Sequence, residues 1–214
     1  MLAKASFLVC CESSGVVREA MRAKGIDAYS CDILPADDNS PYHIQADCRK
    51  VMLDFNWTGF GLHPDCTYLS VAGIHWNNRG RGWDKTNAAL TFVKELIKLA
   101  GDKFWYLENP VSIISTHIRK PDQTIQPYNF GEDASKRTCL WLNRLPLLIP
   151  TERIFGRVCY NDDNGKAIER FSNQTDSGQN KLTPSKDRWK IRSRTYKGIA
   201  KAMAAQWAPI LLNN

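Results

Sequence analysis

The chain has 214 residues, of which 43% are hydrophobic and 24% charged, and it carries a formal net charge of +7. This length allows one α/β domain with a full core and little more, and the composition is ordinary for a globular protein. No apolar stretch approaches the roughly 20 residues that a membrane-spanning helix needs, so we expect no membrane partner.

The seven cysteines are predicted to be free thiols in a reducing, cytoplasmic location. Their number is odd, and the N-terminal segment lacks the layout of a signal peptide. No two cysteines form a Cys-x-x-Cys pair and the four histidines are scattered, so we expect no metal site. The cysteines are Cys10, Cys11, Cys31, Cys48, Cys66, Cys139 and Cys159.

Strand-like and helix-like segments alternate along the first half of the chain. The predicted segments are a strand at 7–10, a loop at 12–15, a helix at 16–24, strands at 26–31, 43–46 and 59–62, a helix at 87–100 and a strand at 104–107. Such alternation predicts an α/β fold with a doubly wound, mostly parallel sheet that helices cover on both faces.

The pattern is looser in the second half of the chain. Residues 139–142 and 147–149 are predicted as later strands, and the polar residues 151–185 as an insertion or a flexible excursion. Apolar positions between Ile199 and Leu211 predict a terminal amphipathic helix. With no internal repeat and no clear second domain, we expect residues 1–214 to form a single domain.

Two short motifs place reactive side chains at the ends of predicted strands. Residues 63–70 (HPDCTYLS) follow the strand at 59–62, and residues 107–110 (LENP) end the next one. In open α/β sheets, ligands bind at the carboxyl ends of the strands. There the thiol of Cys66 could add to a ring carbon while the carboxyl group of Glu108 protonates a ring nitrogen.

This combination resembles the DNA (cytosine-5) methyltransferases, whose Pro-Cys loop and Glu-Asn-Val loop supply the same two groups. Here Asp65 stands where the family has proline, and Pro110 where it has valine. The resemblance implies that Cys66 is the nucleophile, that Glu108 acts on ring nitrogen 3 of cytosine, and that Asn109 shapes the loop. The alternatives are a buried inert thiol and a salt bridge at the strand end.

Asp65 is expected to raise the pKa of the Cys66 thiol, because a neighbouring carboxylate disfavours the thiolate. A cation such as Arg137 or Arg194, or the helix that follows Cys66, would compensate for this effect. The resemblance also implies an arginine beside the flipped base, and Arg137 is the candidate; the alternative places Arg137 on a surface hairpin.

The first loop and the strand ends after it resemble the S-adenosylmethionine pocket of class I methyltransferases. Asp32 is expected to bind the ribose hydroxyls and Asp47 the adenine amino group, with Asp37 and Asp38 as alternatives for the ribose. The other interpretation is a plain strand–helix turn with solvated acids. The implied cofactor-binding residues are Cys11, Glu12, Ser13, Gly15, Asp32, Asp47, Pro64, Thr195 and Gly198.

A basic stretch near the C-terminus predicts contact with nucleic acid. Residues 181–197 hold seven basic side chains against the single acid Asp187, with aromatic residues between them. A solvated basic loop is the alternative. The candidate nucleic-acid-binding residues are Lys186, Arg188, Trp189, Lys190, Arg192 and Arg194.

These features predict methyl transfer from S-adenosylmethionine to carbon 5 of cytosine in DNA, through a covalent cysteine adduct on a base flipped from the duplex. The resemblance is closest to small proteins of the kind that phages encode. It implies a reduced target-recognition or insertion region at 111–190, a return to the core at 192–212, and a protein partner as a candidate for target choice. The alternatives are an inactive protein that binds nucleic acid or a host protein, and the same cysteine chemistry on RNA, on a free pyrimidine nucleotide or with another one-carbon donor.

Overall fold

A seven-stranded sheet forms the centre of the molecule in the computed structural model, which describes residues 5–160 and 165–214. The strands are β1 (Ser6–Cys10), β2 (Asp27–Asp32), β3 (His43–Gln45), β4 (Gly59–Leu62), β5 (Phe104–Pro110), β6 (Gln123–Ile125) and β7 (Thr138–Asn143). Their spatial order is β3-β2-β1-β4-β5-β7-β6. Neighbours from β3 to β5 are parallel, whereas β7 is antiparallel to β5 and β6. The predicted α/β class with a mostly parallel sheet is confirmed.

The order of the strands reverses between β1 and β4. From β1 the chain adds β2 and β3 on one side, and it then returns to add β4 and β5 on the other. At such a switch point the connections after neighbouring strands leave toward opposite faces, and ligands bind outside the carboxyl ends of these strands. A site is therefore expected beyond the ends of β1 and β4.

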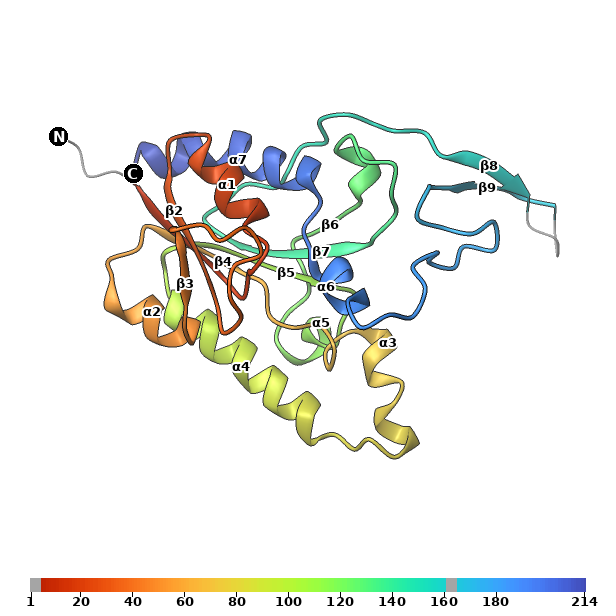
Figure 1. Cartoon of the computed structure of the whole chain (residues 1–214), viewed down its shortest axis with the longest axis horizontal. Coiled ribbons are helices and arrows are strands. Elements are labelled where there is room, and N and C mark those ends of the chain that lie inside the picture. Colours follow the sequence, from red (N-terminus) through yellow and green to blue (C-terminus); the bar gives the residue numbers. More distant parts are fainter. Residues whose placement is uncertain (1–4, 161–164) are drawn as a thin grey trace.

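Helices cover both faces of the sheet (Figure 1). Helices α1 and α7 pack together on one face, and α2 and α4 pack together on the other. The helices are α1 (Val16–Arg22), α2 (Cys48–Asp54), α3 (Val71–Ile74), α4 (Asp84–Ala100), α5 (Ile114–His117), α6 (Arg188–Ser193) and α7 (Lys197–Leu212), with 3₁₀ turns η1 (Asn77–Arg79) and η2 (Pro127–Asn129). Within residues 5–160 and 165–214, none of these helices combines the length and the apolar character needed to cross a membrane.

Strand β1 shows how the sequence specifies a core on both sides of the sheet. Phe7 and Val9 are fully buried in the cluster that includes α1 and α7, and Leu8 and Cys10 in the cluster that includes α2 and α4. Successive side chains of a strand point to opposite faces, so a strand that is covered on both sides is apolar at every position. This explains why residues 7–10 lack polar alternation.

The segment 147–149 is not a strand, and its prediction as one was wrong. It lies between Pro146 and Pro150, which lack the backbone N–H groups that a sheet ladder uses. Leu148 pairs with a side chain instead. Its N–H donates to Oε1 of Gln123 at 2.8 Å, and its carbonyl accepts from Nε2 of the same residue at 2.7 Å. Gln123 thus occupies the place of a neighbouring strand.

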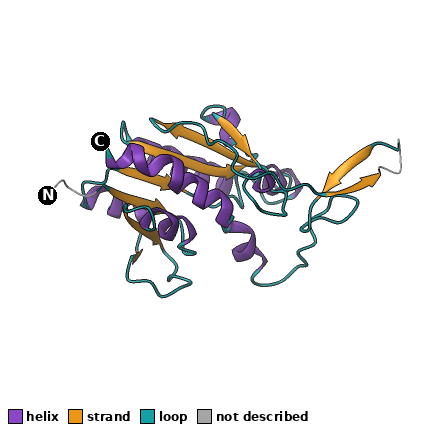
Figure 2. Cartoon of the chain, turned by 90° about the horizontal axis from the view of Figure 1, so that it is seen from above, coloured by secondary structure: helices purple, strands orange, loops and turns teal. Residues whose placement is uncertain are grey.

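The predicted polar excursion at 151–185 contains a hairpin. Strand β8 (Arg157–Tyr160) pairs in antiparallel fashion with β9 (Ala167–Arg170), and the hairpin projects from one end of the molecule (Figure 2). Residues 161–164 lie outside the described residues. Strands β6 and β7, which fall in the range 111–190, belong to the main sheet, so the part that leaves the sheet is shorter than that range.

Helix α7 brings the end of the chain back to the sheet. Trp207 is fully buried and lies against the ring of Tyr106, with the ring centroids 5.1 Å apart. Its indole N–H donates to the carbonyl of Pro146 at 3.0 Å. Near the start of the helix, a Cβ on Gly198 would lie 1.8 Å from the carbonyl oxygen of Phe130. The missing side chain of Gly198 therefore lets α7 dock.

Candidate functional site

The carboxyl ends of the central strands place several predicted site residues at one edge of the sheet. Cys10 is in register with Cys31 and with Leu62, and Leu62 is in register with Leu107. Because these strands are parallel, the residues that follow them lie at the same edge. Those residues are Cys11, Asp32, His63 and Glu108. The loop after β1 and both reactive motifs are thus brought together.

Glu12, in the loop after β1, binds the start of helix α1. Its carboxylate accepts hydrogen bonds from the backbone N–H groups of Val17 (2.8 Å) and Arg18 (3.3 Å). Burial raises the pKa of Glu12 to about 7, against the opposing effect of these bonds and of the Arg18 charge. The carboxyl group predicted to contact a cofactor already satisfies unpaired donors of α1.

Gly15 is required by an arginine beneath the same loop. Its φ of +67° is left-handed, and a Cβ on it would lie 2.1 Å from Nη2 of Arg18. The Arg18 side chain is fully buried; it donates to Oγ of Ser30 at 2.7 Å and pairs with Glu19 at 2.9 Å and with Asp38. Packing of the arginine accounts for this glycine without a ligand.

Asp32 keeps more acceptor capacity than Asp47. The half-buried carboxylate of Asp32 accepts from the backbone N–H of Leu34 at 3.0 Å, and burial raises its pKa. Asp47 caps α2 by accepting from the N–H of Arg49 at 3.0 Å, and it also pairs with the Arg49 guanidinium at 2.6 Å. The hydrogen bond from that guanidinium lowers the pKa of Asp47. A ligand at Asp47 has to compete with Arg49.

The alternative ribose acceptor Asp37 is held by two cations. Its side chain is only 10% exposed and pairs with Lys190 and with Arg194, each at 2.6 Å. Burial alone would raise the pKa of Asp37, but hydrogen bonds from the two cations hold it below its ordinary value. The Asp37 N–H also donates to the carbonyl of Ser13 at 2.9 Å. Since Asp38 is paired with Arg18, these contacts favour Asp32 for the ribose.

The turn that carries Cys66 is bonded to the end of β5. The Cys66 carbonyl accepts from the N–H of Ser70 at 2.9 Å. Asn109 donates from Nδ2 to the carbonyl of the buried Pro64 at 2.9 Å. This bond joins the strand end that bears Glu108 to the turn that bears the thiol. The other amide atom, Oδ1 of Asn109, is buried and has no hydrogen-bond partner in the described part of the chain.

Cys66 is half-buried among charges of both signs. Burial raises the pKa of its thiol, and the negative charges of Asp65 and Glu108 raise it further. The positive charges of Lys136 and Arg192 act in the opposite direction. The expected effect of Asp65 is confirmed, and the thiolate is disfavoured unless these cations or a substrate compensate.

The position of Asp65 has a local explanation. Its Oδ1 accepts from the N–H of Thr67 at 3.0 Å and from the Thr67 hydroxyl at 2.7 Å, as in an Asx turn. The compensating cations differ from those proposed from the sequence. Arg194 is paired with Asp37, and Arg137 is exposed and acts on the pKa of Cys139. A role for Arg137 beside a base stays a prediction.

Two residues at this edge escaped the sequence analysis. His63 and Tyr106 are joined by a hydrogen bond of 2.8 Å between Nε2 and Oη, and burial lowers the pKa of His63. A Cβ on Gly61 would lie 2.5 Å from the Tyr106 hydroxyl. A glycine within a buried strand was therefore the feature of the sequence that could have indicated a close neighbour at this position.

The segment 136–138 was expected to bring cations to this edge, and its Lys136, not Arg137, is the one whose charge acts on Cys66. The Nζ of Lys136 donates to the carbonyl of Arg192 at 2.9 Å.

The basic stretch folds as helix α6 and its flanks, and part of its charge is already neutralised. Lys190 and Arg194 are bound to Asp37. Trp189 and Lys186 are exposed, whereas Nε of Arg188 is buried without a partner among the described residues. Contact of this stretch with nucleic acid stays a prediction, and the pairs with Asp37 reduce the positive charge that it presents.

The remaining cofactor candidates lie where the chain returns to the core. Thr195 is buried. Gly198 donates its N–H to Oε1 of Glu132 at 2.8 Å. Its Cα lies against the backbone of Phe130, so packing explains why this position holds a glycine. A cofactor contact at either position stays a prediction.

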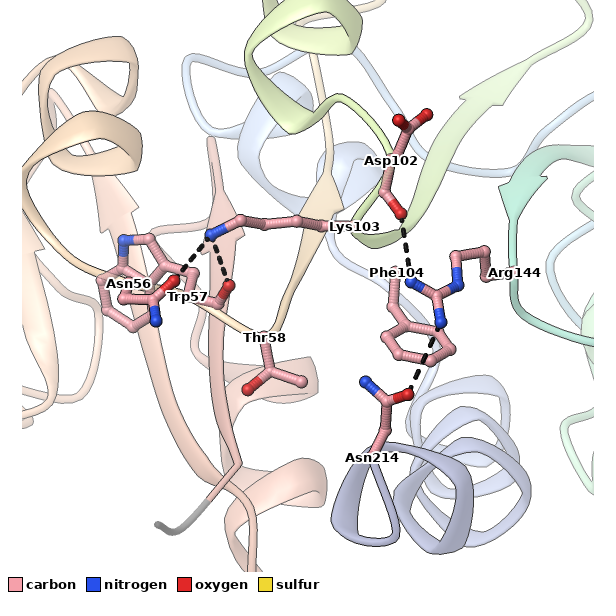
Figure 3. Close-up of a pocket in the computed structure, with 8 residues that line it drawn as sticks. All are labelled: Asn56, Trp57, Thr58, Asp102, Lys103, Phe104, Arg144 and Asn214. Atoms are coloured by element: carbon pink, nitrogen blue, oxygen red, sulfur yellow. Dashed lines mark hydrogen bonds between the residues drawn. The ribbon is translucent and has the colours of Figure 1, made fainter.

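A surface cavity of about 400 Å³ lies at the opposite edge of the sheet (Figure 3). It is lined by Asn56, Trp57, Thr58, Asp102, Lys103, Phe104, Arg144 and Asn214. Lys103 donates to Oδ1 of Asn56 at 3.2 Å and to the carbonyl of Trp57 at 2.7 Å, so it already has acceptors within the protein. Across residues 5–160 and 165–214, no three His, Cys, Asp or Glu side chains are grouped so as to hold a metal ion.

Comparison of the chain with models of protein families finds no match, and neither does comparison with curated proteins. What bears on function is therefore the chemistry of the sheet edge itself. There Asp32 ends β2, Glu108 lies near the end of β5 and Cys66 follows β4, at the edge where open α/β sheets bind their ligands.

Proposed function

We propose that the protein transfers a methyl group from S-adenosylmethionine to carbon 5 of cytosine in DNA. The observation that carries the proposal is the hydrogen bond from Asn109 to the carbonyl of Pro64, because it holds the strand end of Glu108 against the turn of Cys66. The two groups also influence each other electrostatically, since the charge of Glu108 helps to raise the pKa of Cys66. A thiol and an acid held in this way suit addition to a pyrimidine ring.

The two side chains have complementary tasks. The thiolate of Cys66 forms a bond to carbon 6, and Glu108 gives a proton to ring nitrogen 3, so charge does not accumulate on the ring and carbon 5 becomes nucleophilic. S-adenosylmethionine, when bound, supplies an electrophilic methyl group. The reaction ends when carbon 5 loses its proton to solvent, the bond between carbon 6 and the Cys66 sulfur breaks, and Glu108 recovers its proton. The base has to leave the duplex stack for this attack.

The edge of the sheet fits such a cofactor in two respects. The carboxylate of Asp32 has acceptor capacity left after its bond to Leu34 and would hold the ribose hydroxyls. The buried Oδ1 of Asn109, which has no hydrogen-bond partner among the described residues, is an acceptor for an amino group of the cofactor or of the base. The loop that bears Ser13 is fixed to the loop after β2, because the Ser13 carbonyl accepts a hydrogen bond from the N–H of Asp37.

A second candidate is a protein of this fold that binds nucleic acid without catalysis. The observation that favours it is the raised pKa of Cys66, because burial and Asp65 both keep the thiol protonated. In this alternative, the same edge would bind the cofactor or its demethylated product without forming an adduct.

Covalent trapping separates the two candidates. Duplex DNA of mixed sequence that contains 5-fluorocytosine cannot release the cysteine after methyl transfer, so we expect a denaturation-resistant adduct in the presence of S-adenosylmethionine. Cys159→Ser, in strand β8, should form the adduct and Cys66→Ser should not. Glu108→Gln should lower the rate by about 10²–10⁴. Binding of S-adenosylmethionine in calorimetry without any adduct would decide for the non-catalytic protein.

A further inference from the structure

Four thiols gather below the loop that follows β1. Cys10 and Cys31 face each other in the register of β1 and β2, Cys11 follows Cys10, and Cys48 begins helix α2. The Sγ atoms of Cys11 and Cys48 are 3.9 Å apart, although the two residues are 37 positions apart in the chain. All four are free thiols.

Cys11 and Cys48 are the reactive pair within this cluster. The Sγ of Cys48 lies within hydrogen-bond distance of the Cys11 Sγ, and hydrogen bonding with the thiols of Cys10 and Cys11 lowers the pKa of Cys48 well below its ordinary value despite its burial. The same contact raises the pKa of Cys11, so the thiolate of the pair resides on Cys48. Cys11 is partly exposed, so solvent reaches the pair on that side. The other two thiols are less available, because Cys10 is fully buried and Cys31 donates to the carbonyl of Ala46 at 3.3 Å.

The backbone at Cys11 supports the same assignment. Its φ of +59° lies in the left-handed region, which non-glycine residues rarely adopt. Such conformations gather at functional sites, where the surrounding structure enforces them. Here the conformation turns the chain at the end of β1, next to the start of α2.

We propose that Cys11 and Cys48 form a reversible disulfide on exposure to a peroxide. Hydrogen peroxide, which enters on the exposed side of Cys11, converts the thiolate of Cys48 to a sulfenic acid with loss of hydroxide. The sulfur of Cys11 then loses its proton and displaces the hydroxyl group from the Cys48 sulfur. In total, two thiols lose one hydrogen each and the peroxide becomes two molecules of water. The sulfur atoms have to approach by about 2 Å, since a disulfide bond measures about 2.05 Å.

The disulfide would connect the loop of Glu12 to the start of α2, which Asp47 caps. That these two segments hold the cofactor rests on the proposed function. If they do, the disulfide between Cys11 and Cys48 changes the cofactor site both at the loop and at the helix start. Because coupling between two equilibria is reciprocal, a cofactor that binds the reduced form more tightly also opposes the disulfide. We expect S-adenosylhomocysteine to bind at least about threefold more weakly to the oxidised protein.

The test is peptide mapping of the full chain after treatment with hydrogen peroxide and alkylation of the remaining thiols. A linked Cys11–Cys48 peptide that dithiothreitol separates is the expected result, and it needs no variant. Cys11→Ser and Cys48→Ser should lose it, while Cys159→Ser keeps it. A linkage between other cysteines, direct oxidation of Cys48 to the sulfinic acid, or zinc bound to the native cluster in metal analysis would overturn the proposal.

A parallel reaction with S-adenosylhomocysteine present distinguishes this proposal from the proposed function. If the linked peptide forms at the same rate with and without the compound, the disulfide stands and the assignment of the cofactor site fails. If no linked peptide forms in either reaction, the disulfide fails, whatever the trapping experiment with 5-fluorocytosine shows.

Discussion

At the scale of single residues, Cys66 is the position where opposing charges meet. Burial and two carboxylates disfavour its thiolate, and Lys136 and Arg192 favour it. Asp65 is the neighbour that can be changed with least damage to the turn, because its contacts with Thr67 come from one carboxylate oxygen. Asparagine retains such an oxygen and removes the charge.

We expect Asp65→Asn to speed alkylation of Cys66 by iodoacetamide at neutral pH by roughly two- to tenfold, since loss of the neighbouring negative charge raises the thiolate fraction. The measurement is the rate of modification of Cys66 across pH, followed by mass spectrometry. Asp122→Asn is the control, because it removes a carboxylate that pairs with Arg119 at 2.8 Å and is not among the charges that act on Cys66. Equal rates in wild type and Asp65→Asn would show that Asp65 acts through the turn alone.

At the scale of elements, helix α6 is held to the loop after β2. Asp37 joins them by pairing with Lys190 at 2.6 Å and with Arg194 at 2.6 Å. Both cations are partly exposed, and exposed ion pairs of this kind contribute little to stability. The contact instead decides how much positive charge α6 and its flank present to a polyanion.

Asp37→Asn should therefore strengthen DNA binding by the basic stretch. Release of two cations to phosphate groups would steepen the dependence of log K on log salt by up to about 1.8, at about 0.9 for each phosphate. Titration of labelled duplex DNA at several salt concentrations measures this slope. Asp176→Asn, which frees Arg157 on the hairpin, is the matched control. A slope that stays the same in Asp37→Asn means that the stretch is a solvated loop.

At the scale of the whole molecule, the sheet has an apolar layer on each face and a few buried polar groups between them. Among the described residues, the buried charged ones are Arg18, Glu12 and Glu108, at 0%, 4% and 8% exposure. A carboxyl group whose pKa is higher in the folded than in the unfolded protein binds its proton more tightly in the folded protein, and this stabilises the fold at low pH. The contribution to the free energy of unfolding is complete below the pKa of the unfolded state and is lost as the pH rises through the pKa of the folded state.

We expect Glu12 to lower the free energy of unfolding by on the order of 3 kcal/mol as the pH rises from about 4.5 to 7. These two pH values are the ordinary pKa of a glutamate and the raised pKa of Glu12 in the folded protein. Glu12→Gln should lack this part of the pH dependence while it retains an acceptor for the N–H of Val17. Urea unfolding at pH 5 and pH 8 provides the measurement, with the half-exposed Glu19→Gln as control. Parallel pH profiles of wild type and Glu12→Gln would contradict this expectation.

Local patterns located most strands and the long helices of the first half. The predicted strand at 59–62 coincides with β4, and the predicted helix at 87–100 is α4 without its polar first turn. Helix α2 was missed, because Asp47 was assigned to ligand binding, whereas it is the N-cap of this helix. An aspartate at a strand end and one at a helix start look alike in a sequence.

The sequence by itself determined the alternation of strands and helices and the two reactive motifs, because burial pattern and turn chemistry are local properties. Only the tertiary structure decided which charges and thiols meet. Arg194 reaches Asp37 across 157 positions of the chain, and Cys11 reaches Cys48 across 37. Such contacts depend on strand order and on the docking of distant segments, and no local pattern encodes either.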